Sequence, residues 1–173
     1  NIDSQDSYLN MTKADFSIQN NDLDSARDLY LRAIEFSDDP GPIKIKLLNT
    51  YIELGENEIA IDFSNELLNQ YPNNPNIYYN VGVVYSRITK EKMDLYFKLF
   101  NEINQLEKPT EAMIRQAYDD IRRVRKYAYS AKEYFLEAND LEQSGDLSTE
   151  DAIKEMNKVL NNIDNIYMDN VKT

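Results

Sequence analysis

The sequence contains no cysteine and no histidine, and it has only four glycines and five prolines among 173 residues. It therefore lacks the ligands that most protein zinc sites use, together with the commonest general base. Disulfides are excluded, which leaves the redox compartment open. No glycine-rich phosphate loop or spaced set of metal ligands is present, so only Asp, Glu, Lys or Tyr could serve an enzyme. We expect no enzyme activity, no cofactor and no bound metal.

The chain is strongly acidic, with 31 acidic residues, 19 basic residues and a net charge of −12. Nucleic-acid binding depends on Lys and Arg that displace counterions from phosphates, so we expect no nucleic acid as a partner. An anionic membrane surface is disfavoured for the same reason. No apolar run approaches the roughly 18–20 residues that span a bilayer, so we expect no direct membrane insertion. A protein that offers a basic segment is the partner that electrostatics favours.

The source and compartment are addressed only indirectly. The chain begins at Asn1 rather than at a methionine, which predicts an upstream targeting segment that this sequence does not include. Twenty asparagines, with many Ile, Lys and Tyr residues, indicate an AT-rich genome, and we expect a low-GC bacterium. The bacterial cytoplasm and the exported or periplasmic face of the envelope both remain open as locations.

Long stretches without Gly or Pro, together with a hydrophobic fraction of 42%, predict an all-α domain with a real core. Polar turns at 20–22, 38–42, 55–57 and 71–75 separate segments whose apolar residues recur at helical spacing. We therefore predict two helix pairs before Pro75. A third pair follows, whose second helix covers about 91–107.

The pattern changes after Pro109. Apolar residues then recur in steps of three and four from Thr110 to about Glu142, without Gly or Pro. This predicts either one long helix, ended by Gly145, or a fourth pair whose turn is not visible. A last helix begins after Ser148, and its wide apolar stripe extends to Tyr167.

Small residues repeat at an offset of thirty-four positions. Ala26 aligns with Ala60, and Asn21 aligns with Gly55. A period of about 34 is the length of a helix–turn–helix unit that cannot bury its apolar face alone. Such units stack, and their stacked surface binds other proteins.

These repeats resemble the tetratricopeptide repeat family, in which small residues and aromatics alternate at fixed positions of two helices. The matching residues are Tyr78, Val81, Gly82 and Tyr85 for helix A, Ala26, Tyr30 and Ala33 for helix B, Ala131, Phe135 and Ala138 for a further helix B, and Tyr51, Gly55, Ala60 and Pro72 in the second repeat. Ser64 and Leu67 depart from the pattern, and a small residue is missing near Asp94.

The resemblance implies an all-α fold of the α-α superhelix type. Three helix pairs would occupy 1–109, and a long helix or degenerate fourth repeat would occupy 110–145. A C-terminal capping or interaction helix would occupy 148–173, because terminal repeats need a cap for solubility.

The resemblance also implies a concave groove formed by helix A faces. The expected protein-binding residues are Met11, Asp15, Ile18, Ile45, Asn49, Ile52, Tyr79, Val83 and Ser86. The family's clamp for a C-terminal carboxylate is not expected, because Ile45 and Asn76 stand at its cationic positions. The apolar character of the groove favours an amphipathic helix. Three alternatives remain open for the groove: the chain's own C-terminal helix occupies it, a helix of another protein occupies it, or neither does.

A basic cluster interrupts the acidic chain at Arg122, Arg123, Arg125 and Lys126. One interpretation is a secondary patch that docks an acidic partner or a sister subunit. The other, which we favour, is a solvated helix face paired with Asp119 and Asp120 at i, i+3 and i, i+4 spacing.

The favoured function is a non-catalytic scaffold or adaptor that binds a helical or extended segment of another protein and stabilises it. The alternative is a structural component of a bacterial envelope assembly, in which the long helix and the C-terminal stripe form a homo-oligomer.

Overall fold

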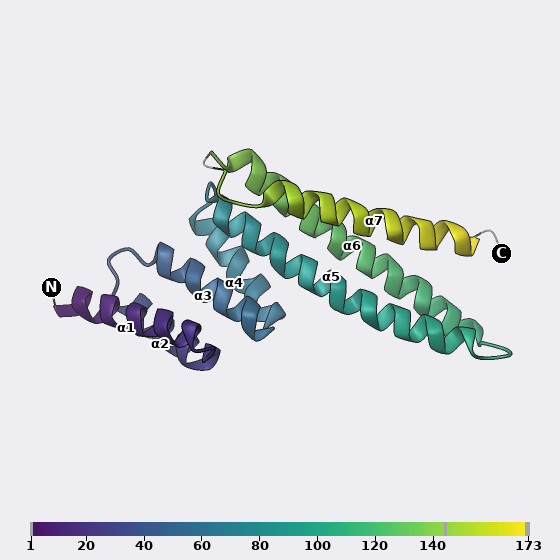
Figure 1. Cartoon of the computed structure of the whole chain (residues 1–173), viewed down its shortest axis with the longest axis horizontal. Helices are drawn as coiled ribbons and strands as arrows, with labels where there is room; N and C mark the ends of the chain where they lie inside the picture. Colours follow the sequence, from purple (N-terminus) through teal and green to yellow (C-terminus); the bar gives the residue numbers. More distant parts are fainter. Residues whose placement is uncertain (1, 144, 172–173) are drawn as a thin grey trace. The chain divides into compact units, whose positions relative to one another are not determined.

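A computed structural model describes residues 2–143 and 145–171, and the described chain is helical with no strand (Figure 1). The described side chains are those of 5–143 and 145–166, so the side chain of Tyr167 lies outside them. The helices in this part are α1 Ile2–Gln19, α2 Leu23–Glu35, α3 Gly41–Leu54, α4 Asn57–Gln70, α5 Pro75–Asn104, α6 Glu111–Leu141 and α7 Thr149–Val171. The chain divides into two compact units inside α5, between Asn80 and Val81.

The first unit contains the two helix pairs predicted before Pro75. Consecutive helices pack on one another, α1 on α2, α2 on α3 and α3 on α4. Their shared core is built around small residues that let the backbones approach, with one large aromatic among them. This core cluster comprises Ala14, Ala26, Tyr30, Ala33, Ile43 and Leu47.

The turns of the first unit have the conformations that their residues favour. Asn21 adopts a left-handed backbone with φ of 58°, and Gly55 does so with φ of 75°. Asn and Gly tolerate this region better than other residues, which is why the chain reverses there. Asp22 caps α2 by accepting a hydrogen bond from the backbone N–H of Ser25 at 3.2 Å.

The predicted third helix pair is wrong, because α5 runs without interruption from Pro75 to Asn104. The separate second helix expected at 91–107 is therefore the continuation of the first. No Gly or Pro lies between Gly82 and the end of α5, so nothing in the segment 83–104 breaks the backbone hydrogen-bond ladder. Ile88 and Thr89, near the expected turn, are buried in the middle of the helix.

The C-terminal part of α6 packs against α5 at Gly82. A carbon placed at the Cβ position of Gly82 would lie 2.6 Å from Cδ1 and Cε1 of Phe135. The rings of Tyr85 and Tyr134 stack beside this contact, with centroids 5.5 Å apart. The aromatic residue that faces Gly82 therefore comes from the C-terminal part of α6 and not from the segment 91–107.

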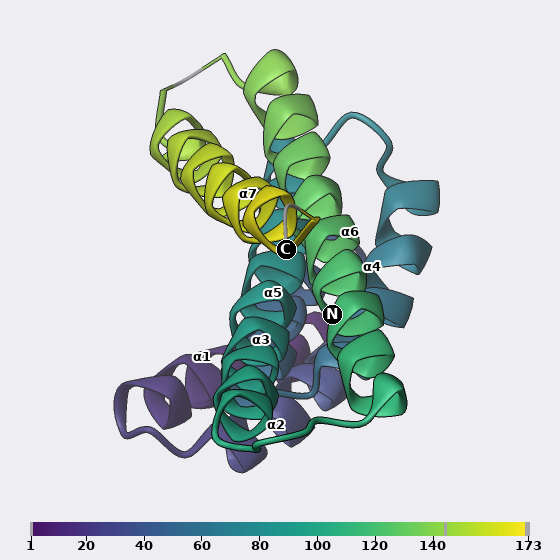
Figure 2. The same ribbon diagram turned by 90° about the vertical axis from the view of Figure 1, so that its right-hand side faces the viewer.

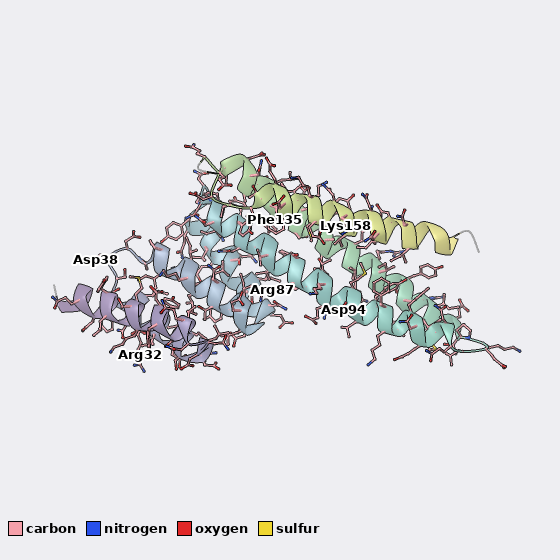
Figure 3. The ribbon with its side chains drawn as sticks, in the orientation of Figure 1. Arg32, Asp38, Arg87, Asp94, Phe135 and Lys158 are labelled. Carbon is pink, nitrogen blue, oxygen red and sulfur yellow. The ribbon has the colours of Figure 1, made fainter. Side chains whose placement is uncertain are left out.

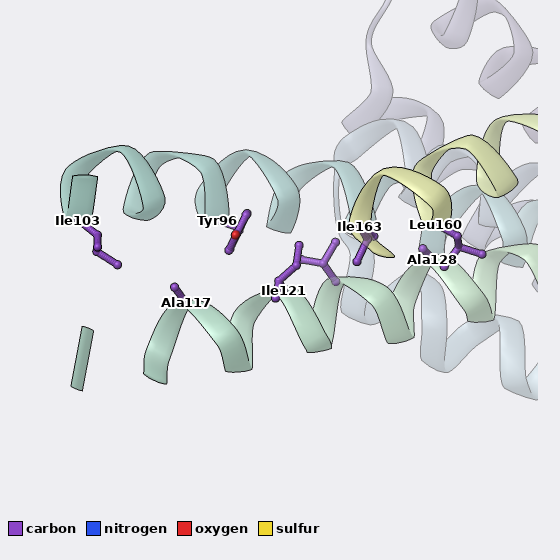
Figure 4. Close-up of a cluster of buried hydrophobic side chains, with 8 residues drawn as sticks. Tyr96, Ile103, Ala117, Ile121, Ala128, Leu160 and Ile163 are labelled. Carbon is purple, nitrogen blue, oxygen red and sulfur yellow. The ribbon is translucent and has the colours of Figure 1, made fainter. Parts of the chain in front are cut away.

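The second unit consists of α5 from Val81, α6 and α7, which lie alongside one another in both views (Figures 1 and 2). The segment after Pro109 forms the single long helix α6, Glu111–Leu141, which was one of the two predictions, and its end lies next to the expected Glu142. Figure 4 shows the buried side chains that fill the space between the three helices. This core cluster comprises Tyr96, Ile103, Ala117, Ile121, Val124, Ala128, Leu160 and Ile163.

Candidate protein-binding surfaces

Some of the predicted contact residues lie in the first unit and some in the second, and only some of their side chains are accessible to a partner. In the first unit Ile18 and Asn49 are exposed, whereas Met11, Asp15, Ile45 and Tyr79 are half-buried. Ile52 is only 3% exposed, which corrects its assignment as a contact residue, because a side chain inside the core cannot meet a partner. In the second unit Val83 and Ser86 are half-buried.

Asp15 joins three helices of the first unit. Its carboxylate accepts hydrogen bonds from Lys46 Nζ of α3 at 2.7 Å and from Tyr30 Oη of α2 at 2.5 Å. Partial burial alone would raise the pKa of Asp15, but the bonds from Lys46 and Tyr30 outweigh it, so the pKa lies below its ordinary value of 3.8. Burial and the bond to Asp15 raise the pKa of Tyr30 well above its ordinary value. The role of Asp15 is therefore to hold α1, α2 and α3 together.

This cluster predicts a specific dependence of stability on pH. Because the pKa of Asp15 is lowered in the folded chain, the unfolded chain binds its proton more readily. The ionised Asp15 therefore stabilises the folded chain above pH 3.8, and this stabilisation is lost as the pH falls through the lowered pKa. We expect the free energy of unfolding, measured with urea between pH 2 and 7, to fall less on acidification for Asp15→Asn than for the unmodified chain. Asp62→Asn, a substitution at an exposed position of α4, should leave the acid loss unchanged. Equal acid profiles for all three proteins would contradict the assignment.

The second unit contains a groove of about 480 Å³ between α5 and α7. On α5, the lining residues recur in steps of three and four, which places them on one face of the helix. Residues of α7 in steps of three form the opposite wall. We call this surface the α5–α7 groove, and its principal lining residues are Ser86, Lys90, Met93, Phe97, Met156 and Val159.

The groove is apolar along its floor and charged at its edges. Phe97 is 42% exposed, which is a large aromatic surface to leave in water. Met93 packs partly against the core cluster of the second unit, as Val159 does from α7. Arg87, Asp94 and Glu155 also line the groove, so both signs of charge surround the apolar floor. Figure 3 labels Arg87 and Asp94 along α5.

The α7 wall is held in place by polar contacts as well as by its buried stripe. Asp164 accepts hydrogen bonds from Arg125 Nε at 2.6 Å and from Arg125 Nη2 at 3.4 Å. The same guanidinium lies 4.8 Å from the centre of the Tyr129 ring. At the other end, the hydroxyl of the buried Thr149 donates to Asn139 Oδ1 at 2.9 Å. The C-terminal helix is thus part of the second unit and forms one side of the groove.

The basic cluster of α6 is engaged mainly within its own unit. Arg122 and Arg123 lie 3.9 and 3.5 Å from Asp119 and Asp120, the i, i+3 pairing that the sequence predicted. Arg125 pairs with α7, and Lys126 is exposed. These contacts favour a solvated helix face over a docking patch, since neighbouring carboxylates compensate most of the positive charge.

Sequence reasoning found Ser86 but missed the rest of the α5–α7 groove. The signal was present in the spacing of Ser86, Lys90, Met93 and Phe97, which forms one stripe only if the helix continues. The expected turn before 91 placed Met93 and Phe97 on a different helix. The apolar stripe predicted for the last helix includes Met156 and Val159, but the sequence does not indicate which part of that stripe is buried.

Two further kinds of site are absent from the described part of the chain. No group of three or more Asp and Glu residues there is arranged to hold a metal ion. None of the helices searched within it is both long and apolar enough to cross a membrane.

A comparison with protein-family models finds no match, and a comparison with curated protein sequences finds none either. Among solved structures, the chain is similar to a protein from Bacteroides ovatus ATCC 8483 whose name gives protein binding as a provisional function. The TM-score is 0.67 at 13% identity, and the match covers 91% of this chain and 74% of that one. This likeness shows the fold. The predicted all-α fold class is confirmed. The structure of MamA protein also matches, with a TM-score of 0.45, 16% identity, and coverage of 95% of this chain and 89% of that chain.

Proposed function

We propose that this protein is a non-catalytic interaction scaffold that binds an amphipathic helix of another protein in the α5–α7 groove. The observation that carries this proposal is an open, apolar, two-helix groove whose floor includes the exposed ring of Phe97. Phe97 is exposed beside the half-buried Met93 and Val159, and a continuous apolar surface of this kind is often covered by another protein. The Bacteroides ovatus protein of similar fold is named for protein binding, and this supports the same class of function here.

The dimensions of the groove favour a helix as its guest. Ser86 and Phe97 are eleven residues apart on α5, so the lined face is about 16 Å long at about 1.5 Å per residue. Three turns of a guest helix span this length and place apolar side chains at i, i+4 and i+7 along it. Met93 suits such a guest, because its unbranched thioether side chain adapts its shape to different anchors. Met156 is only 4% exposed and supports the groove from the core. The net charge of −12 favours a guest with basic residues on its outer face.

We also propose membership of the tetratricopeptide repeat family. The packing of Gly82 against Phe135 supports it, because these two residues occupy the small and aromatic positions of one repeat. Under this proposal the further contact residues of the helix A faces are Met11, Ile18, Ile45, Asn49, Tyr79 and Val83. Of these, Ile18 and Asn49 are the most accessible and are the first to test.

The groove is tested by display of a library of amphipathic helical peptides, selected against the full chain. We expect the selected peptides to carry three apolar anchors at i, i+4 and i+7. Phe97→Glu should weaken their binding at least about thirtyfold, because a charge then replaces a central apolar contact. Leu95→Glu is the matched control, since Leu95 is also an exposed apolar residue of α5 but lies outside the groove. Titration calorimetry measures both, and equal weakening by the two variants would contradict the proposal.

A further inference from the structure

A second cavity lies at the far end of the second unit, where α5 ends and α6 begins. Its volume is about 240 Å³, and it shares no lining residue with the α5–α7 groove. Side chains of both helices and of the connecting segment surround it. We call it the tip cavity, and its principal lining residues are Tyr96, Phe100, Ile103, Pro109, Ala117 and Tyr118.

Aromatic rings form one wall of the tip cavity. The rings of Tyr96 and Phe100 are nearly parallel, with centroids 5.8 Å apart and an interplanar angle of 24°. On α6, the lining residue Ala117 is 8% exposed and contributes only a methyl group. The cavity exists because this side chain is too small to fill the space beside the rings. An additional aromatic ring placed there would contact faces and edges of rings already fixed in position.

The polar groups of the tip cavity are few. Tyr96 is 3% exposed. Burial raises the pKa of its hydroxyl, and the nearby Tyr118 raises it further, so the hydroxyl is neutral at physiological pH. A neutral phenol both donates and accepts a hydrogen bond. Asn104 adds an amide to the lining. A mostly apolar space with a small number of polar groups is the usual composition of a ligand site.

The size of the tip cavity restricts its occupant. An apolar cavity of about 150 Å³ is enough to hold benzene, whereas drug-sized ligands and cofactors occupy about 300–1,000 Å³. At about 240 Å³ the tip cavity is suited to one substituted ring and is too small for a nucleotide.

We propose that the tip cavity binds a single aromatic ring that carries one hydrogen-bonding group, such as a phenol or an indole. This chemistry has two sources, a free small aromatic molecule or the side chain of a Tyr or Trp in a bound protein segment. Ile114 at the lining and Leu106 in the connecting segment are 40% and 46% exposed. The exposed apolar surface of Ile114 provides a rim on which the backbone of a bound segment can rest.

The test uses p-cresol and indole as probes of the full chain, with the methyl NMR signals of Ile103 followed during titration. We expect saturable shifts with a dissociation constant on the order of 1 mM or tighter for fragments of this size. Ala117→Leu fills the cavity and should weaken binding at least tenfold without lowering the melting temperature. Ala112→Leu makes the same change at an exposed position of α6 and should leave binding intact.

A second variant guards against misfolding of the first. Ile114→Glu changes a partly exposed residue of the lining and should also weaken binding of both probes at least tenfold. Retained binding in both Ala117→Leu and Ile114→Glu, or no saturable shift with either probe in the unmodified chain, would overturn the proposal. N-acetyl-tyrosinamide and N-acetyl-tryptophanamide then distinguish the sources. Binding of these blocked residues assigns the site to a protein side chain, and binding of the free rings alone assigns it to a small molecule. Neither result affects the α5–α7 groove, which is tested at Phe97.

Discussion

Gly82→Val should destabilise the second unit by about 2 kcal/mol or more, because the position has no space for a side chain. A Cβ at Gly82 would lie 2.6 Å from two carbons of the Phe135 ring, closer than any relaxed contact. Phe135 is 3% exposed and cannot swing away into solvent. Overpacking of this kind usually costs about 1–3 kcal/mol, and the small gain in helix propensity over glycine does not offset it. Urea unfolding followed by circular dichroism measures the change.

The size complementarity of Gly82 and Phe135 is separated from general damage by a double-mutant cycle. Phe135→Ala alone should cost about 3–5 kcal/mol by leaving a cavity. Combined with Gly82→Val, it should cost less than the sum of the two by at least about 1 kcal/mol, because valine then occupies part of that cavity. Additive losses would mean that the two side chains do not share space. Asn101→Val, on an exposed turn of the same helix, should cost little.

The fold was predictable from sequence where turn residues mark the ends of helices. Asn21 and Gly55 lie in the predicted turns and adopt the left-handed conformation, and the helices that they separate pack as adjacent pairs. Gly82 was recognised as the small residue of a helix A, and its aromatic partner Phe135 was recognised as part of a helix B. What the sequence did not indicate was that these two residues, more than fifty positions apart, pack against each other.

The continuation of α5 beyond residue 90 was not predicted, because the 34-residue period demanded a turn before residue 91. No residue near Ile88 and Thr89 breaks a helix, so the local signal favoured continuation, and tertiary packing agrees with it. The α5–α7 groove was missed for the same reason, since Met93 and Phe97 share a face with Ser86 only in the continuous helix. The partial burial of Asp15 by Lys46 and Tyr30 depends on the spacing of three helices, which no sequence pattern specifies.

Ile163→Asp should release α7 from the second unit. Ile163 is 1% exposed and lies in the core cluster with Ile121 and Leu160. The substitution removes an apolar side chain that is worth about 2–5 kcal/mol and places an uncompensated carboxylate in the same space. We expect a loss of about 4 kcal/mol or more, measured by urea unfolding. Asn161→Asp adds the same charge at an exposed position of α7 and should have little effect.

Release of α7 would also remove one wall of the α5–α7 groove, because Met156 and Val159 move with it. Hydrogen exchange should then show fast exchange across α7 while the amides of α6 stay protected, and helical peptides selected on the unmodified chain should no longer bind. Asn161→Asp should retain both the protection and the binding. If Ile163→Asp kept full peptide affinity with α7 exchanging freely, α5 alone would bind the guest, and α7 would be a packing helix without a part in recognition.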